Sequence, residues 1–153
     1  MSSASTDAPP TVVGFAPRRS PLRDLPGLAA LVTTYDDLEQ ALTALPLDRP
    51  VLLLADDADT VEDERGFLEQ WLSAPATGHH MIAAGRADTL RRSYGHWTQR
   101  TRDSRCGVLL CPDHDLDGDL LGTQLPRHDR MAPLPGRGYL VVDGVAAGVQ
   151  VAN

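Results

Sequence analysis

One uninterrupted apolar run that ends in two carboxylates constrains the fold of this chain more than any other segment. Val51 to Ala55 contain no polar residue, and Asp56 and Asp57 follow directly. A strand that is apolar at every position is typical of a parallel sheet with both faces covered. Such sheets bind ligands at the carboxyl ends of their strands, so the two aspartates are the first candidates for a functional site.

Strand-like and helix-like segments alternate along the 153 residues. The strand-like runs are residues 11–16, 28–33, 50–56, 80–84 and 107–111. Amphipathic spacing predicts helices over residues 34–45, 62–73 and 88–97, and a short helix over residues 116–122. Residues 139–142 and 148–152 are expected to pair as a hairpin around Asp143-Gly144. The pattern predicts a three-layer α/β fold with a mainly parallel sheet, closed by a C-terminal hairpin.

Composition bounds the organisation and the compartment of the chain. Residues 1–10 are small, polar and proline-bearing, which predicts a disordered tail before one folded domain over residues 11–153. The net charge of -7 argues against a general nucleic-acid surface. Neither a signal peptide nor an apolar stretch of the roughly 18 residues that a membrane span needs is visible. Cys106 and Cys111 are neither a disulfide framework nor, on opposite faces of an expected strand, a zinc site. These features predict a cytoplasmic protein without direct membrane contact.

Two acidic clusters each have a catalytic and a structural interpretation. Asp56 and Asp57 can bind magnesium and orient a water for phosphoryl transfer, or they can begin an acidic loop that caps the next helix. A phosphorylatable receiver domain, which also has paired aspartates after a strand, needs a lysine, and the chain has none. The segment from Asp113 to Asp119 has the spacing of a calcium loop, but Gln124 stands where the bidentate carboxylate is required. A polar turn that caps a short helix is the preferred interpretation of this segment.

Arginine supplies every one of the 14 residues counted as Lys+Arg, and six of them gather in one stretch. The six are Arg86, Arg91, Arg92, Arg100, Arg102 and Arg105. They fit a solvated helix face with ion pairs, or a patch that faces a partner or a nucleotide. Tyr94 and Trp97 lie in the same stretch and can either pack in the core or anchor a peptide or a neighbouring subunit.

Several segments in a fixed order resemble the motor domain of FtsK/SpoIIIE-type ATPases, and most of all the modules of type VII secretion (EccC-like) ATPases. The run from Leu52 to Asp57 is similar to the Walker B strand of that family, and residues 80–86 are similar to the strand that follows it. Residues 103–105, 117–122, 135–139 and 149–151 resemble later motifs. The resemblance implies the C-terminal part of a RecA-like P-loop NTPase fold, over about residues 11–153.

The same resemblance assigns roles to four residues. Asp56 takes the position of the magnesium-side carboxylate, and Asp57 takes that of the acid that activates water. Arg86 is the arginine at the end of the following strand, and Arg137 is a second candidate for contact with nucleotide. The P-loop half is missing, because the chain has no lysine and no G-x-x-x-x-G-K-[ST] segment. Ala84-Gly85 also replaces a Thr-Gln step of the family. Asp56 and Asp57 are therefore expected to be vestigial.

The resemblance implies a non-catalytic or degenerate ATPase module of a secretion or translocation machine, which binds a substrate protein or regulates an active ATPase module. The alternative is a fragment of an active ATP-driven motor, for type VII protein secretion or DNA translocation, whose P-loop lies upstream. ATP and magnesium are expected as ligands only because of the family resemblance. No hydrolysis is expected from this chain alone. The expected partners are other ATPase modules or subunits and a secreted protein or peptide, with DNA less favoured. Those partners can tether the chain to a membrane complex.

Overall fold

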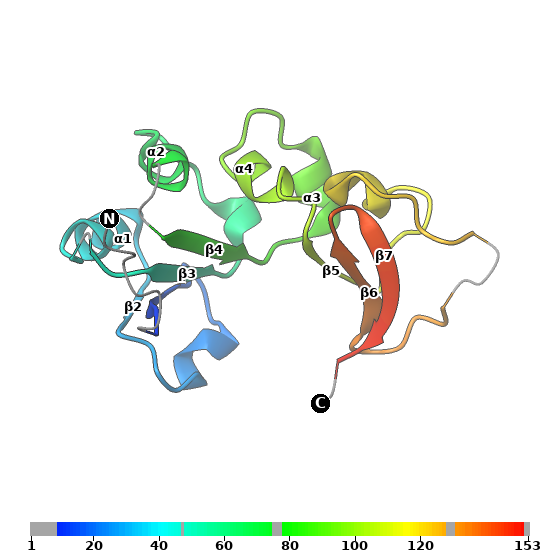
Figure 1. Ribbon diagram of the computed structural model, residues 1–153, viewed down its shortest axis with the longest axis horizontal. Coiled ribbons are helices and arrows are strands. Elements are labelled where there is room, and N and C mark those ends of the chain that lie inside the picture. The colour runs from blue at the N-terminus through cyan, green and yellow to red at the C-terminus, as the bar shows by residue number, and fades with distance from the viewer. Residues whose placement is uncertain (1–8, 47, 75–77, 128–130, 152–153) are drawn as a thin grey trace, which may run out of the picture. The chain divides into compact units, whose positions relative to one another are not determined.

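The computed structural model describes residues 9–46, 48–74, 78–127 and 131–151 (Figure 1). They form two compact units, one up to Gly85 and one from Arg86 onward. Most of the expected tail, residues 1–8, lies outside the described residues, and Pro9 and Pro10 are exposed without regular structure. No helix in these described ranges combines the length and apolarity needed to cross a membrane.

The first unit contains a parallel sheet of four strands. These are β1 (Thr11–Phe15), β2 (Ala30–Val32), β3 (Val51–Ala55) and β4 (His79–Ala83), in the order β2-β1-β3-β4. The pairs β1–β2, β1–β3 and β3–β4 are all parallel, with Leu53 opposite Val13 on one side and Met81 on the other. This confirms that the apolar run is an internal parallel strand and that Asp56 and Asp57 follow its carboxyl end, beside the end of β4.

Two α-helices connect the strands of this sheet. Helix α1 (Tyr35–Thr43) begins as predicted, because the Thr34 side chain accepts the amide hydrogen of Asp37 at 3.1 Å. Helix α2 (Phe67–Ser73) begins five residues later than expected, after Gly66 in a left-handed conformation with φ of 66°. The cause is Asp63, whose carboxylate accepts the amide hydrogens of Leu68 and Glu69 and so caps the helix from outside it.

The two faces of the parallel sheet are covered unequally. The connections through α1 and α2 cross the sheet in the same direction, so right-handed crossovers place both helices on one face. Phe15, Leu53 and Leu38 are almost fully buried. On the opposite face Ile82 of β4 is 61% exposed, and β4 alternates between half-buried and exposed residues. The apolar residues 80–84 also suggested a strand buried on two faces, but β4 is an edge strand of this sheet with one exposed face, so that expectation is wrong.

The second unit contains a separate antiparallel sheet. Its strands are β5 (Gly107–Leu110), β6 (Arg137–Val142) and β7 (Val145–Gln150), in the order β5-β6-β7. The expectation of one mainly parallel sheet is thus only partly correct, because β5 pairs with β6 in the antiparallel sense and with no strand of the first sheet in the described residues. The hairpin also differs from the prediction, since β7 starts directly after Gly144.

The turn explains this register. Asp143 and Gly144 have φ of 50° and 77°, and they join Val142 to its partner Val145. Positive φ at both central residues is the signature of a two-residue type I′ turn, whose twist matches that of the strands. The pairing therefore begins immediately after the turn, and Ala152 lies outside the described residues.

The helices of the second unit are short. They are α3 (Ala87–Arg92), α4 (Gln99–Arg102) and the 3-10 turn η3 (Asp117–Leu121). The described part of the first unit contains the 3-10 turns η1 (Pro21–Asp24) and η2 (Ala58–Thr60). The helix expected through Trp97 ends at Arg92, because the Ser93 hydroxyl bonds to the Thr89 carbonyl and Gly95 has a φ of 70°. The short helix expected over residues 116–122 is η3.

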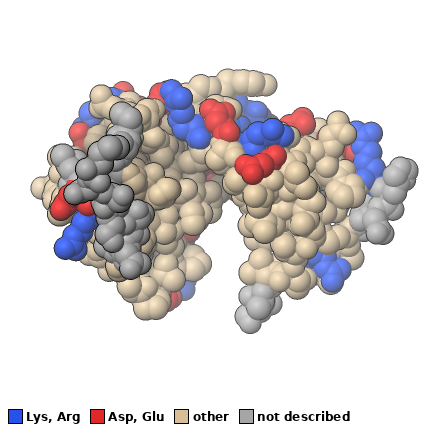
Figure 2. All heavy atoms as spheres, in the orientation of Figure 1, with Lys and Arg blue, Asp and Glu red and all other residues tan. Residues whose placement is uncertain are grey.

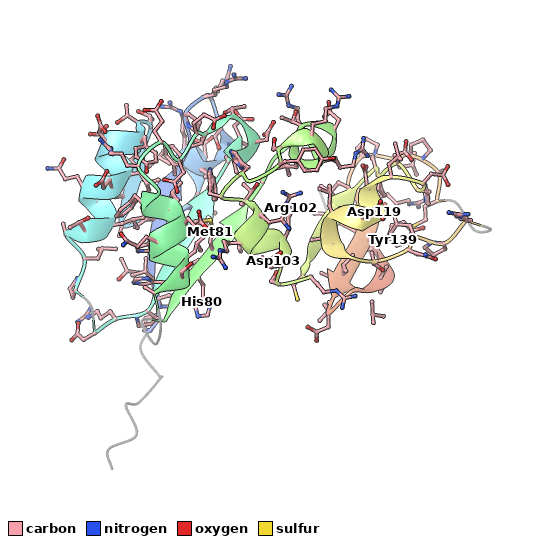
Figure 3. All side chains as sticks on the ribbon, turned by 90° about the horizontal axis from the view of Figure 1, so that it is seen from above. His80, Met81, Arg102, Asp103, Asp119 and Tyr139 are labelled. Carbon is pink, nitrogen blue, oxygen red and sulfur yellow. The ribbon has the colours of Figure 1, made fainter. Side chains whose placement is uncertain are left out.

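A small core holds the second unit together. Leu109, Tyr139 and Val141 point from the sheet toward Leu120 and Leu121 of η3, and all five are at least nine-tenths buried. Leu125, Leu90 and Met131 add to this cluster. Tyr139 of β6 is labelled in Figure 3. The inner face of the antiparallel sheet therefore packs against η3 to form the core of this unit.

Candidate functional site

The two predicted aspartates lie at the carboxyl end of β3. The amide of Asp56 donates to the carbonyl of Phe15 in β1 at 2.9 Å, so this residue extends the sheet by one position. Its carboxylate Oδ1 accepts the amide hydrogen of Asp57 at 3.0 Å. Asp57 has a left-handed backbone with φ of 49°, a conformation that aspartate tolerates better than most residues. Both side chains are half-buried.

Backbone hydrogen bonds fasten this strand end to the end of β4. The amide of Ala84 donates to Ala55, and the amide of Ala58 donates to Ala84, both at 2.8 Å. Thr60 then bonds to the Asp57 carbonyl through both its amide and its hydroxyl, at 2.9 and 2.8 Å. The loop that carries the aspartates is thus held by β1, by the residue after β4 and by its own 3-10 turn.

The most buried acid at this edge of the sheet is a third aspartate, Asp59. Its residue is 7% exposed, whereas Asp56 and Asp57 are half-buried. A Cβ atom added to Gly85 would lie 2.9 Å from Asp59 Oδ1 and 3.2 Å from its amide nitrogen. Asp59 therefore occupies the space that a side chain at position 85 would need. The sequence contains one signal for this residue, because Asp59 follows Asp56 and Asp57 after a single alanine.

The donor set fits magnesium only in part. Magnesium is usually held by one or two carboxylates together with waters and substrate phosphates. Asp56 and Asp57 can supply the carboxylates. Within the described residues, however, no three His, Cys, Asp or Glu side chains gather closely enough to hold a metal ion. Metal binding here would depend on phosphate oxygens, and the chain has no P-loop to position them.

The two candidate arginines belong to the second unit and lie on different elements. Arg86 is exposed and precedes α3, where its carbonyl accepts the amide hydrogen of Leu90 at 3.0 Å. Arg137 is the first residue of β6, and its Nε donates to the Gln150 side chain at 3.3 Å. Arg137 also lines a cavity of about 350 Å³ with Cys111 and His114. His114 in turn contacts the Tyr139 hydroxyl at 3.3 Å.

Three of the six arginines have a structural role within the second unit, and for Arg91 this role is an ion pair, as the helix-face interpretation allowed. Arg91 pairs with Asp117 of η3, Arg102 donates to the Leu90 carbonyl at 3.1 Å, and Arg105 donates to the Gly122 carbonyl at 2.8 Å. Burial lowers the pKa of the Arg102 guanidinium, which is labelled in Figure 3. These three side chains connect segments of the second unit. Long-range partners of this kind leave no periodic signal in a sequence.

The acidic segment that resembles a calcium loop forms a turn. Asp117 accepts the amide hydrogen of Asp113 at 2.8 Å, and Asp113 accepts that of Asp115 at 2.9 Å. The other oxygen of Asp117 pairs with Arg91. These carboxylates therefore serve the local backbone, which confirms the polar turn. The expected cap is not formed, because η3 follows Leu116 without a side-chain cap hydrogen bond.

Trp97 and Tyr94 have opposite environments. Trp97 is 3% exposed, and Tyr94 is 95% exposed. The core alternative is correct for Trp97, so this side chain is not available as an anchor for a partner. Tyr94 remains available, together with the exposed Arg92 close to it in the chain.

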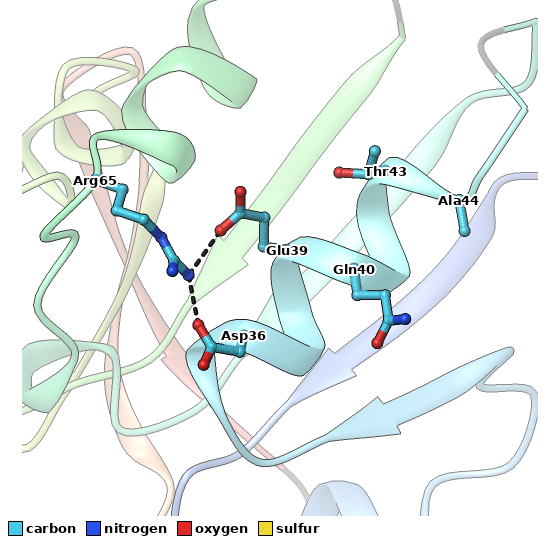
Figure 4. Close-up of a pocket in the computed structure, with 6 residues that line it drawn as sticks. All are labelled: Asp36, Glu39, Gln40, Thr43, Ala44 and Arg65. Atoms are coloured by element: carbon cyan, nitrogen blue, oxygen red, sulfur yellow. Dashed lines mark hydrogen bonds and ion pairs between the residues drawn. The ribbon is translucent and has the colours of Figure 1, made fainter.

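A second, shallow pocket lies on the outer side of α1 (Figure 4). Arg65 reaches across it to Asp36 at 2.5 Å and Glu39 at 2.7 Å, and its guanidinium lies 4.9 Å from the centre of the Tyr35 ring. The hydrogen bond to Asp36 raises the pKa of Arg65 further. These contacts attach the segment before α2 to α1. Arg65, the basic residue among those that line the pocket, is already paired with two carboxylates.

Comparison with known proteins identifies the fold. No protein-family model matches the chain, and no curated protein matches it. Among solved structures, EssC (ATPases 2 and 3) from Geobacillus thermodenitrificans aligns with a TM-score of 0.64 and 16% identity over 94% of this chain and 31% of that one. The cytoplasmic domain of EssC aligns with a TM-score of 0.61 and 16% identity over 93% of this chain and 33% of that one. This chain thus spans about a third of the length of the EssC chains. It shares its fold with part of the EssC ATPase region.

Proposed function

We propose that this chain is a degenerate ATPase module related to type VII secretion ATPases, which acts by binding other proteins. The fold it shares with the EssC ATPases is the observation that carries this proposal. Asp56 and Asp57 stand where the Walker B acids of such a domain are expected, at the carboxyl end of an internal parallel strand. Nothing in the sequence supplies the phosphate-binding loop that those acids serve.

The loop after β4 supports the degenerate interpretation. Related ATPases are expected to carry a polar Thr-Gln step here, whereas this chain has Ala84 and Gly85. Asp59 already fills the space beside Gly85, so a glutamine could not be accommodated without displacing a buried carboxylate. The loop thus lacks the polar step expected of such ATPases, and a buried aspartate lies beside this position instead.

Its partners would be other ATPase modules or subunits, or a secreted protein or peptide, in the cytoplasm. Tyr94 is exposed, and so is Arg92 close to it in the chain. Tyrosine and arginine are residue types that often anchor contacts between proteins. The chain has a net charge of -7, so it would repel the phosphates of DNA, and this favours a protein partner.

A second candidate function is a part of an active motor whose P-loop is supplied by another segment or chain. The observation that favours it is the edge strand β4, whose outer side has no partner strand in the described residues and whose Ile82 is 61% exposed. An added strand could pair there and extend the parallel sheet.

Phosphate release in the presence of magnesium and ATP tests the degenerate assignment. We expect the purified chain to release phosphate no faster than its Asp57→Asn variant, because a positioned phosphate cradle provides most of the charge stabilisation in phosphoryl transfer. Turnover that depends on magnesium and disappears in Asp57→Asn would instead establish an active site in this chain.

A further inference from the structure

A cavity of about 350 Å³, which we call the β6 cavity, lies beside the start of β6. Residues of the loop after β5, residues 131–133 and the first three residues of β6 line it. Pockets for small molecules usually have volumes of about 300–1,000 Å³, mostly apolar walls and a few polar groups that orient the ligand. The volume therefore suits a small ligand, and the chemistry of the lining residues decides its class.

One wall of the β6 cavity is apolar and continues the core of the second unit. Met131 packs against the core cluster and also lines the cavity, together with Pro112. Hydrogen bonds join the wall segments, because the Cys111 amide donates to the Arg137 carbonyl at 2.9 Å and the Cys111 thiol donates to the Leu134 carbonyl at 3.3 Å. These segments are therefore already connected, which lowers the cost of ordering them around a ligand.

Two hydrogen-bonding side chains accompany the basic group of the cavity. Arg137 and Tyr139 are two positions apart in β6, so their side chains leave the same face of the strand. Tyr139 is 3% exposed, and its hydroxyl lies 3.3 Å from His114 Nε2, with the two rings edge to face. This contact holds the His114 ring in the cavity wall.

The charge of Arg137 is not neutralised by an acid among the described residues. Its Nε donates to the neutral side chain of Gln150, and no described acid lines the cavity or pairs with Arg137. By contrast, Arg91 and Arg65 pair with carboxylates. Figure 2 shows that the surface over β7, the strand of Gln150, is mostly neither acidic nor basic. The guanidinium of Arg137 thus keeps the planar fork that binds a carboxylate through two parallel hydrogen bonds.

We propose that the β6 cavity binds a small organic acid. Arg137 holds the carboxylate, His114 and Tyr139 lie beside it, and the aliphatic or aromatic part of the acid packs against Met131 and Pro133. Inorganic phosphate matches the guanidinium but leaves the apolar wall in contact with water. The inference goes beyond the proposed function and does not depend on it, because no residue at the ends of β3 and β4 lines this cavity.

Titration of the ¹⁵N-labelled full chain with benzoate, followed by two-dimensional NMR, tests this inference. We expect saturable shifts of the amide signals of residues 111–114 and 137–139. Benzamide has the same ring without the charge, and acetate has the charge without the ring. Each should bind at least about tenfold more weakly than benzoate, because each lacks one of the two contacts. Inorganic phosphate should also bind more weakly than benzoate.

Two arginine variants locate the site. Arg137→Met keeps most of the side-chain length and removes the charge, so it should weaken benzoate binding at least about tenfold. Arg92→Met is the matched control, because Arg92 is an exposed arginine of the same unit that does not line the cavity, and it should bind benzoate as wild type does.

The dispersion of the amide signals shows whether each variant is folded. If Arg137→Met does not fold, Arg137→Lys replaces it; lysine keeps the charge but not the fork, so benzoate should bind severalfold more weakly. Absence of saturable benzoate binding overturns the inference, and so does binding of benzamide or phosphate as tight as that of benzoate. Equal weakening by Arg92→Met and the Arg137 variant would also overturn it, because the binding would then reflect only the total charge of the chain.

Discussion

At the scale of single residues, the carboxylate of Asp63 organises the segment before α2. It accepts hydrogen bonds from the Tyr35 hydroxyl and from the amides of Leu68 and Glu69. One acid thus caps α2 and links it to the start of α1. Burial, followed by the hydrogen bond to Asp63, raises the pKa of Tyr35 from 10.0 to about 12.

This shift predicts a dependence of stability on pH. The fold favours the neutral phenol, so the stabilisation is complete below pH 10 and is lost as the pH rises toward 12. Tyr35→Phe should lower the free energy of unfolding by roughly 1 kcal/mol at neutral pH, the typical net value of one hydrogen bond. Urea unfolding of both proteins should show this difference shrinking between pH 10 and 12. Tyr94→Phe, altered at an exposed ring, is the control, and a Tyr35→Phe difference that stays constant up to pH 12 would contradict the assignment.

Trp97 and Tyr94 give a second prediction at this scale. Trp97→Ala should lower the free energy of unfolding by about 3–5 kcal/mol, because it removes a large side chain that is only 3% exposed. Tyr94→Ala should change it by less than about 0.5 kcal/mol, since that side chain is 95% exposed. Urea unfolding followed by circular dichroism measures both. Similar losses from the two variants would show that Trp97 does not belong to the core.

Site residues at the strand ends could be predicted where a local sequence pattern indicated them. Asp56 and Asp57 were found because an apolar strand points to them. Asp59 was missed because its burial depends on Gly85, a residue from the next strand end. The partners of Arg91 and Arg105 were not predicted for the same reason, since Asp117 and Gly122 are distant in the sequence. Sequence separation, and not residue type, limited the prediction.

At the scale of the elements, the turn between β6 and β7 depends on a glycine. Gly144 has a φ of 77°, and an added Cβ would lie 2.0 Å from Arg105 Nη2. Arg105 would have to move, and its hydrogen bond to the Gly122 carbonyl would be at risk.

Gly144→Ala should therefore destabilise the chain more than the backbone strain alone explains. Alanine at positive φ costs about 1 kcal/mol, and loss of the Arg105 contact should add roughly as much again. Gly95→Ala is the matched control, because Gly95 has a φ of 70° and no atom within 4 Å of an added Cβ. Thermal unfolding should rank Gly144→Ala below Gly95→Ala, and equal stability of the two variants would refute the role of Arg105.

The elements were predictable where one residue encodes their boundary. Thr34 caps α1, and Asp143-Gly144 fixes the hairpin turn. Boundaries failed where a tertiary contact sets them, as for α2, which starts where Asp63 caps it. β7 was placed too late because Val145-Ala-Ala-Gly has a weak preference for strand.

At the scale of the whole molecule, the chain combines a parallel sheet and an antiparallel sheet in two compact units. Alternating apolar runs predicted the parallel sheet and its internal β3. They could not predict that β5 joins a second sheet, because a fully apolar strand reads the same in either sheet. The exposed faces of β4 and of the β5–β7 sheet, which carry Ile82 and Val145, were invisible for the same reason, since apolar residues alone do not show whether anything covers them.

We propose that the chain shares its fold with part of the EssC ATPase region but has no working nucleotide site. Titration of magnesium-ATP into the purified chain, followed by isothermal calorimetry, tests this claim most directly. We predict no saturable binding up to about 1 mM nucleotide, a limit that corresponds to less than about 4 kcal/mol of binding free energy. Saturable micromolar binding that requires magnesium and is weakened by Asp56→Asn would contradict the account and show that the strand-end carboxylates still form a working site.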